Sequence, residues 1–463
     1  MPAQYHIDEP RWTGTRQILI MSAPIVLGMI SHAVMEFFDK WMVAQVSTEA
    51  FAAVGSAGIW SYTLATLFLG VIGCVGTFVA QSFGKGNLQH CAHYAWQGIH
   101  LSLPLGILAV AMIPLSRPLF DLMGHDPGVT EQELVYFRIR LIGYFALGWS
   151  TALAAFFQAV NRSWIPMLTS TTGILLNILL NYLLIFGHGG FPRLGIAGAA
   201  IATVTSQCVQ VILLHGVFIA SPFHRAYNTR HTWRLDYHRA KELVTIGVPA
   251  GMGSFLDIAM WSIFTSFLVG RFGTVSLAAH NAAMVFLHIC FMPALGLHQG
   301  IAAIVGQWIG AGDIPRAKAR TVTAIKLAMA HMVPSGLLLG VFGGKLIAWG
   351  FSDDPNVIRM GHQLLILAAI FQAFDAVNII GLGALRGAGD TRWTMFAMFF
   401  GAYIIFLPLA IFVACVLGLG AVGAWIGATI YIIGLSFVIY RRFMGERWRH
   451  INIFSESQPT QAA

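Results

Sequence analysis

Charged side chains are scarce in this sequence. Asp, Glu, Lys and Arg together make up 10% of its 463 residues, whereas a soluble globular protein carries about 25%. Hydrophobic residues reach 57%. Too few polar side chains remain to cover a water-facing surface, which excludes a cytosolic enzyme, a secreted domain and a disordered scaffold. The composition therefore indicates an integral membrane protein with little chain left for soluble domains.

Cysteine pairs and nucleotide-binding motifs are missing. The five cysteines stand singly, with no CxxC spacing, so we interpret them as small core residues rather than a redox or zinc site. No GxxxxGK[ST] segment occurs, which excludes a P-loop ATPase in this chain. No cofactor is expected, and transport would have to draw on an ion gradient. The net charge of +8 comes without any motif for nucleic-acid recognition.

Long apolar runs are what the sequence does contain, and they predict about twelve membrane-spanning helices. The first residues lack the features of a cleavable signal peptide, so the first of these helices is expected to remain in the mature protein. The predicted helices cover residues 17–45, 50–82, 92–115, 131–158, 164–187, 195–220, 242–270, 276–309, 317–342, 356–385, 392–417 and 420–441.

The basic residues of the loops predict the orientation. Eighteen of the 27 Lys and Arg residues fall on the side that holds both termini, and five fall on the other side. Positive charge accumulates on the cytoplasmic side of membrane proteins, so both termini are expected there. The remaining four, Arg138, Arg140, Lys326 and Arg359, are placed near the starts of predicted helices.

An internal repeat organises the chain. The segment VAQSFGKGN at 79–87 matches VGQWIGAGD at 305–313 with an offset of 226, and Pro24 pairs with Pro249 at an offset of 225. A near-constant offset across several segments indicates two halves of six helices each. Because six is even, both halves have the same orientation in the membrane.

The repeat predicts an all-α integral membrane protein with two pseudo-symmetric six-helix lobes around a central cleft. Such a pair of lobes suits alternating access around one binding site. The predicted divisions are a cytoplasmic amino-terminal segment, an amino-terminal lobe, a basic cytoplasmic linker, a carboxy-terminal lobe and a cytoplasmic tail. Their boundaries are 1–16, 17–220, 221–241, 242–441 and 442–463.

Few ionisable residues lie inside the predicted spans. Asp39 lies in the first helix, Asp257 in the seventh and Asp375 in the tenth. A charge within the bilayer costs a few kcal/mol or more, so each is a candidate ion-coupling residue. The alternative is that each carboxylate is a structural group satisfied by a neighbouring helix. Glu36, one turn before Asp39, either supports that site or pairs with Lys40 near the interface.

Three asparagines accompany these acids. Asn177 and Asn181 are four residues apart and share one helix face. Asn378 follows Asp375 by three residues and faces the same way. Their amides either hydrogen-bond a carboxylate and its proton or supply oxygen ligands to a cation. The alternative is interhelical hydrogen bonding without a transport role.

These residues give the sequence its resemblance to the multidrug and toxic compound extrusion (MATE) family, in its NorM-like branch. The resemblance covers about residues 15–445. It is carried by Pro24 with Asp39, the two repeated motifs, the asparagine pair, Pro249 with Asp257, and above all FQAFDAVNIIGLGALRGAGDT at 371–391. It implies a twelve-helix transporter that exports organic cations, often drugs, in exchange for sodium or protons.

The resemblance also implies roles for single residues. Asp39 matches the acid whose protonation is proposed to change the state of the amino-terminal lobe, and Asp375 matches an acid proposed to couple cations. Asp257 stands where the NorM branch commonly has Glu, and Phe371 stands where some relatives have a Tyr that helps at the ion site. Asp257 and Asp375 are thus the candidate sodium ligands, and no other metal is expected.

The sequence is compatible with three functions. The favoured one is an antiporter of amphipathic cations in the cell membrane, expected to be a monomer. A flippase for a lipid-linked intermediate would need a basic cavity for pyrophosphate, whereas the charges inside the predicted spans are acidic. A membrane-embedded transferase would need a magnesium motif such as DDxxD, and the one Asp pair, Asp353 and Asp354, stands alone in a short predicted outer loop.

Overall fold

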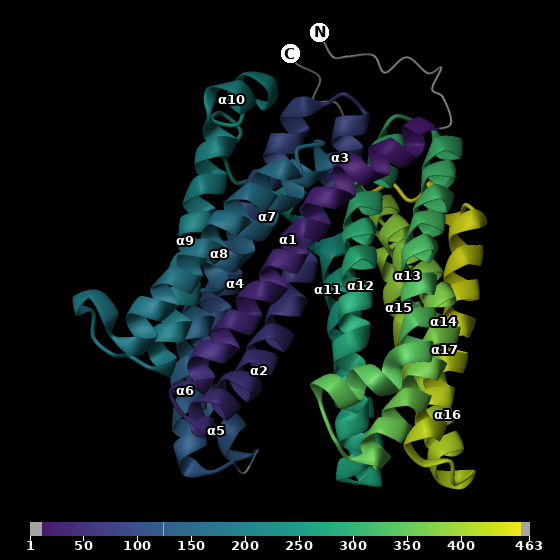
Figure 1. Cartoon of the computed structure of the whole chain (residues 1–463). Coiled ribbons are helices and arrows are strands. Elements are labelled where there is room, and N and C mark those ends of the chain that lie inside the picture. The colour runs from purple at the N-terminus through teal and green to yellow at the C-terminus, as the bar shows by residue number, and fades with distance from the viewer. Residues whose placement is uncertain (1–11, 124, 455–463) are drawn as a thin grey trace, which may run out of the picture. The chain divides into compact units, whose positions relative to one another are not determined.

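The computed structural model describes residues 12–123 and 125–454. This part of the chain is helical, without any strand, which confirms the all-α prediction. Of the predicted terminal segments, residues 1–11 and 455–463 lie outside the described residues. Figure 1 labels the helices in chain order.

The described residues of the first half of the chain form ten α-helices, with short 3₁₀ turns at Ile113–Leu115 and His188–Gly190. They are α1 Trp12–Ala44, α2 Thr48–Gly73, α3 Val75–Gly84, α4 Leu88–Ala111, α5 Ser116–Asp121, α6 Pro127–Ile142, α7 Tyr144–Ala159, α8 Trp164–Phe186, α9 Ile196–Ile219 and α10 Ser221–Tyr227.

The second half includes three π-helical stretches. Its elements are α11 Tyr237–Ile263, the π-helix η3 Phe264–Val269, the 3₁₀ turn η4 Gly270–Phe272, α12 Thr274–Gly310, α13 Ile314–Gly350, α14 Pro355–Ala388, α15 Thr391–Phe399, the π-helix η5 Phe400–Phe406, α16 Leu407–Ile411, the π-helix η6 Phe412–Val416, α17 Gly420–Met444 and the 3₁₀ turn η7 Arg447–His450.

The number of spans agrees with the prediction. Within the described residues, eleven helical segments are long and apolar enough to cross a membrane, and the pair α6 and α7, bent by 45°, makes a twelfth. The bend corrects one expectation. Arg138 and Arg140 lie near the end of α6, just before the break at Gly143, and not near a helix start.

The chain forms two compact units. The amino-terminal unit is built on Leu27–Gly251 and takes in Ile453 and Phe454, and the carboxy-terminal unit joins the described residues up to Val26 to Met252–Asn452. Both α1 and α11 therefore pass from one unit to the other, each two residues after a proline of the repeat, Pro24 or Pro249. The lobe boundaries predicted from the repeat stay a prediction.

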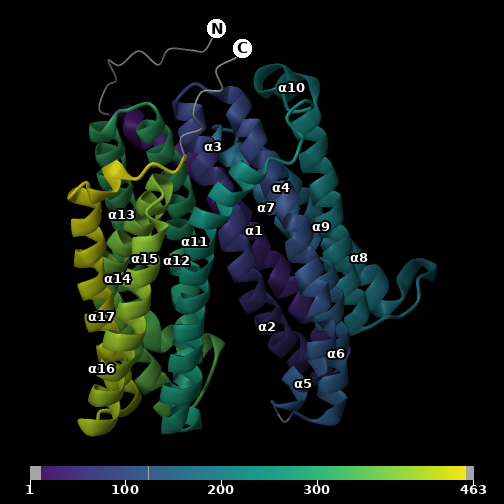
Figure 2. The same cartoon turned by 180° about the vertical axis from the view of Figure 1, so that it is seen from behind.

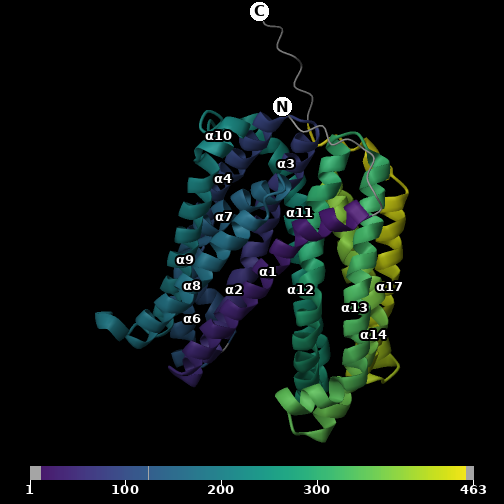
Figure 3. The same ribbon diagram turned by 45° about the horizontal axis from the view of Figure 1, so that its top comes forward.

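Each unit packs its helices through small residues. In the amino-terminal unit α8 and α9 lie side by side (Figure 2), and a Cβ on Gly198 would come within 2.7 Å of the Leu184 carbonyl oxygen. In the carboxy-terminal unit α14 packs against α12, α13 and α17, and Figure 3 shows α13, α14 and α17 in a row. A Cβ on Gly387 of α14 would collide with the Ala302 carbonyl oxygen of α12.

The repeated motif forms the same turn twice. Gly86 and Gly312 have φ angles of 76° and 80°, in the left-handed region that glycine adopts without steric cost. The next residue then caps a helix: Asn87 Oδ1 accepts from the His90 amide at 3.3 Å, and Asp313 Oδ1 accepts from the Arg316 amide at 2.9 Å. The repeat thus preserves a helix-ending glycine followed by a helix-starting cap.

The segment predicted as the 221–241 linker is held against α4. The Trp96 indole donates to the Thr229 carbonyl at 2.7 Å. The buried amide of Gln97 donates to the Arg234 carbonyl at 3.1 Å and accepts from the Asp236 amide at 3.0 Å. One glutamine therefore satisfies two backbone groups of the linker, which gives this polar segment a defined path.

Candidate ion-coupling sites

The amino-terminal site is a chain of hydrogen bonds that begins at Asp39 of α1. The Asn181 side-chain amide, on α8, donates to the Asp39 carboxylate and to Asn177 Oδ1, the latter at 3.2 Å. Asn177 donates at 3.3 Å to the hydroxyl of Thr203 on α9, which donates to the Ala199 carbonyl at 2.9 Å. The structure thus brings together three predicted site residues and adds Thr203, which the sequence did not single out.

Burial explains why the two asparagines need this chain. Asn177 and Asn181 are 0% exposed, and a buried amide left without partners costs about 1–3 kcal/mol. Asn181 Oδ1 nevertheless has no hydrogen-bond partner among the described residues. A free acceptor therefore accompanies the half-buried Asp39, and a protonated Asp39 carboxyl would need such an acceptor for its hydroxyl group.

Glu36 lies on the outside of this site. Its side chain is exposed, and Glu36 Oε1 lies 3.7 Å from His32 Nδ1, one turn earlier on α1. The expected alternative, an ion pair with Lys40, does not form among the residues that the structure describes. An exposed pair of this length contributes little stability, so Glu36 modifies the charge near Asp39 rather than completing the hydrogen-bonded chain.

Two basic side chains act on Asp39: Arg140 of α6, and the exposed Lys40 that follows Asp39 in α1. Arg140 of α6 lies close enough for its charge to act on the Asp39 carboxylate and on His32. Its Nε and Nη1 atoms are buried without hydrogen-bond partners in the described chain. Arg140 is a charged residue inside a predicted span, which could have marked it as a site residue. It was not proposed as one because it was assigned to the start of a helix.

The carboxy-terminal site contains two carboxylates. Asp257 of α11 and Asp375 of α14 belong to the same unit, and the charge of Asp257 acts on Asp375. Asp375 is 8% exposed and accepts a hydrogen bond from Asn378 Nδ2 at 3.3 Å. The Asn378 Oδ1 atom is buried without a partner in the described part of the chain. Carboxylate and amide oxygens that could bind a proton or a cation therefore occur together at this site.

Two tyrosines border this pair. The Tyr403 hydroxyl, in η5, donates to the carbonyl of Leu256, the residue before Asp257, at 2.9 Å. Tyr431 of α17 stacks on Phe406 with ring centroids 5.0 Å apart, and the charges of both carboxylates reach it. Sequence reasoning missed both tyrosines, because nothing in the sequence tells which residues of the last two spans face α11 and α14.

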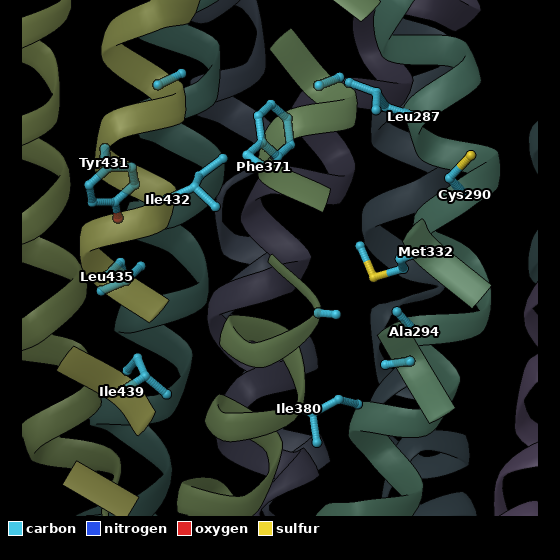
Figure 4. Close-up of a cluster of buried hydrophobic side chains, with 14 of the residues drawn as sticks. Leu287, Cys290, Ala294, Met332, Phe371, Ile380, Tyr431, Ile432, Leu435 and Ile439 are labelled. Carbon is cyan, nitrogen blue, oxygen red and sulfur yellow. The ribbon is translucent and has the colours of Figure 1, made fainter. Parts of the chain in front are cut away.

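Phe371 lies in the apolar core of the carboxy-terminal unit. It is 2% exposed, and Figure 4 shows its ring and that of Tyr431 among aliphatic side chains such as Leu287, Ile380 and Leu435. The phenylalanine thus serves as core packing in this chain, while the tyrosine hydroxyls of the unit come from other helices.

The surroundings of the two carboxylates are acidic rather than mixed. In the described chain, no Lys, Arg or His lies within 4.0 Å of the Asp257 or Asp375 carboxylate. Nor do the described residues contain a group of three His, Cys, Asp or Glu side chains positioned to hold a metal ion. A sodium ion here would need hydroxyl, amide or carbonyl oxygens besides the two carboxylates.

The repeated halves are both recognised by one family model. A model described as MatE matches residues 24–183 and 249–412, two segments that begin 225 residues apart. The chain belongs to the MATE family. A multi-pass member of this family is a transporter and not an enzyme, which excludes the membrane-embedded transferase.

Named relatives cover almost the whole of this MATE chain. It is 31% identical over 434 residues to "Multidrug resistance protein NorM" of Burkholderia vietnamiensis, covering 91% of this chain and 92% of that protein. It is 28% identical over 447 residues to "Multidrug resistance protein MdtK" of Edwardsiella ictaluri, covering 94% and 96%. The predicted resemblance to the NorM-like branch is confirmed.

Solved structures share the fold. An outward-facing multidrug resistance MATE transporter of the MOP superfamily matches with a TM-score of 0.86 at 20% identity, covering 95% of this chain and 97% of that one. A mutant of the Vibrio cholerae MATE transporter VcmN matches with a TM-score of 0.84 at 18% identity, covering 96% and 98%. These likenesses confirm the fold class of the MATE chain.

Proposed function

We propose that this MATE chain is a secondary active antiporter that exports organic cations, including drugs, in exchange for protons or sodium by alternating access. Its relatives are named as multidrug resistance proteins, which supports small amphipathic molecules as substrates. Asp39, Asp257 and Asp375 are the proposed ion-coupling residues, supported by Glu36, Asn177, Asn181 and Asn378.

The observation that carries the proposal is the acid pair Asp257 and Asp375. The charge of Asp257 acts unfavourably on an ionised Asp375, and no Lys, Arg or His of the described chain lies within 4.0 Å of either carboxylate to offset it. A proton or a monovalent cation relieves this repulsion. An organic cation competes for the same negative charge, and competition between substrate and ion at one site is what antiport requires.

Asp39 is proposed to serve a different step. A carboxylate that shares its hydrogen-bonded chain with α8 and α9 changes its bonding when it takes up a proton. That change would alter the amino-terminal lobe without contact between Asp39 and the substrate. Exchange between two states of each lobe is how a proton at Asp39 and a cation at Asp375 would drive one cycle.

The transport experiment imposes one ion gradient at a time. Everted membrane vesicles that contain the protein are loaded with a fluorescent organic cation, and its movement is followed under a proton gradient or a sodium gradient alone. We expect one of the two gradients to drive accumulation. If neither gradient does, and a pyrophosphate-linked lipid is moved instead, the antiporter is excluded in favour of the flippase.

The proposed topology places both termini and the 221–241 linker in the cytoplasm of a monomer in the cell membrane, with the lobes at 17–220 and 242–441. Two matched single-cysteine variants test the orientation, in a background without the five native cysteines. Leu235 in the linker is 68% exposed, and Leu122, on the side predicted to face outward, is 88% exposed. An impermeant thiol reagent added to intact cells should label Leu122→Cys and spare Leu235→Cys.

A further inference from the structure

The amino-terminal site includes the guanidinium group of Arg140, which has no role in the proposed cycle. Arg140 has two buried nitrogen atoms, Nε and Nη1, without a hydrogen-bond partner among the described residues. A guanidinium stays protonated and cannot relieve its burial by losing charge. It therefore needs a negative partner in at least one state of the lobe.

The candidate partners all belong to the surroundings of Asp39. Arg140 acts electrostatically on His32 and Asp39 of α1, on Tyr136 one turn earlier in α6, and on Tyr144 of α7. From α1, the charges of Glu36 and of the exposed Lys40 also act on Asp39. The charge of Glu36 acts on Tyr62 of α2 as well.

Only one of these partners is both acidic and sheltered. Glu36 is exposed and lies 3.7 Å from His32, and the Tyr144 hydroxyl is already donated to the Ser61 carbonyl. Asp39 is the half-buried carboxylate that remains, and Asn181 already binds it.

We propose that Arg140 is a positioning residue for Asp39: its guanidinium serves as the counter-ion of the Asp39 carboxylate in the proton-free state, and it competes with the proton for that carboxylate. This inference rests on the proposed role of Asp39 in ion coupling. A neighbouring cation favours the ionised form of a carboxyl group. Arg140 would thereby set the pH at which the amino-terminal lobe gives up its proton.

The chain offers a matched control on the same helix. Arg138 lies two residues before Arg140, but its Nε donates to the Ser116 hydroxyl at 3.0 Å, away from the Asp39 chain. Arg138→Gln removes the same charge from α6 as Arg140→Gln. His32→Gln is the second control, because His32 is a second ionisable side chain of α1 on which the charge of Arg140 acts.

The transport test measures efflux of a fluorescent cation against pH. In Arg140→Gln the proton stays on Asp39 to higher pH, so the midpoint of the alkaline limb should move up by about one pH unit. Arg140→Lys should restore the original midpoint, and Arg138→Gln and His32→Gln should leave it in place. An unchanged midpoint in Arg140→Gln overturns the proposal, as does an equal shift in Arg138→Gln.

A second measurement needs no transport, so it separates this proposal from the proposed function. The Tm of purified protein is recorded at pH 8 for the wild type, Asp39→Asn, Arg140→Gln and the double variant. If the two side chains act on each other, the double variant loses less than the sum of the single losses, by about 2 °C, and this difference shrinks at pH 5. Additive losses at both pH values overturn the counter-ion role even if Asp39 is essential for efflux.

Discussion

The two acid sites differ in what surrounds the carboxylate. Asp39 stands at the end of a hydrogen-bonded chain that runs through Asn181 and Asn177 to Thr203, with the charge of Arg140 nearby. Asp375 shares its site with a second carboxylate, Asp257, and no basic side chain of the described residues lies within 4.0 Å. One site is close to neutral overall, and the other carries up to two negative charges.

In the proposed antiport cycle, this difference would separate two tasks. A neutral, hydrogen-bonded site responds to one proton by rearranging its bonds, and it has little attraction for an organic cation. In the same proposed cycle, the acid pair would attract an organic cation and release it when protons or sodium take its place. We therefore expect substitutions in the two sites to have different signatures, with loss of switching in the amino-terminal unit and loss of binding in the carboxy-terminal unit.

The largest effect is expected at Asp375. Asp375→Asn removes one charge of the pair, so ion-driven efflux in vesicles should fall by tenfold or more, since about 1.4 kcal/mol already changes a binding constant tenfold. Direct binding of a fluorescent cation should weaken with it. Asp257→Glu keeps the charge and is the matched control, with efflux close to that of the wild type. Vesicles of Asp375→Asn that still exchange cation for proton or sodium at the original rate would refute the acid pair.

Asp39→Asn sharpens the comparison because it should separate efflux from binding. The amide mimics a neutral Asp39 permanently, so efflux should be lost while the protein is still folded and inserted. Cation binding should change by less than about threefold, which is under about 0.7 kcal/mol, because the acid pair in the other unit is untouched. Drug resistance of cells is the first measurement and binding to purified protein the second. Undiminished resistance at normal expression contradicts the role of Asp39.

Substitutions in the hydrogen-bonded chain should have smaller effects on efflux, and the effect should decrease with distance from Asp39 along the chain. Asn181→Leu removes the donor to the Asp39 carboxylate, and a hydrogen bond to a charged group contributes about 1.5–3 kcal/mol. Thr203→Val, at the far end, removes a bond between neutral groups worth about 0.5–1.5 kcal/mol. Efflux should therefore fall more in Asn181→Leu than in Thr203→Val at matched expression. The reverse order would show that the chain does not act through Asp39.

The smallest expected effect belongs to Tyr431. Tyr431→Phe keeps the stacking on Phe406 and removes only the hydroxyl that borders the acid pair. Cation binding should weaken by less than about threefold, or under about 0.7 kcal/mol. If sodium drives transport and this hydroxyl is one of its ligands, the sodium concentration needed for half-maximal efflux rises instead. A tenfold loss of cation binding would instead indicate that the Tyr431 hydroxyl contributes directly to cation binding.

Sequence reasoning reached most of the helices because the bilayer imposes their length and composition. It also proposed Asp39, Asp257 and Asp375 as candidate site residues, since a charge stands out in an apolar span. It missed Thr203, Tyr403 and Tyr431. Their side chains are common in membrane helices, and only the packing of the helices shows which groups they lie beside. It misplaced Arg140 because the bend at Gly143 divides one predicted span into α6 and α7.

The passage of α1 and α11 between the two units has a consequence for cutting the chain. The 221–241 segment would be the natural place to cut, yet the fragments on either side would exchange parts. The first would carry the start of α1 up to Val26, which belongs to the carboxy-terminal unit, and the second would carry the start of α11 up to Gly251, which belongs to the amino-terminal unit. Neither fragment holds a complete unit, so the two halves should assemble only when made together, as a domain-swapped pair does.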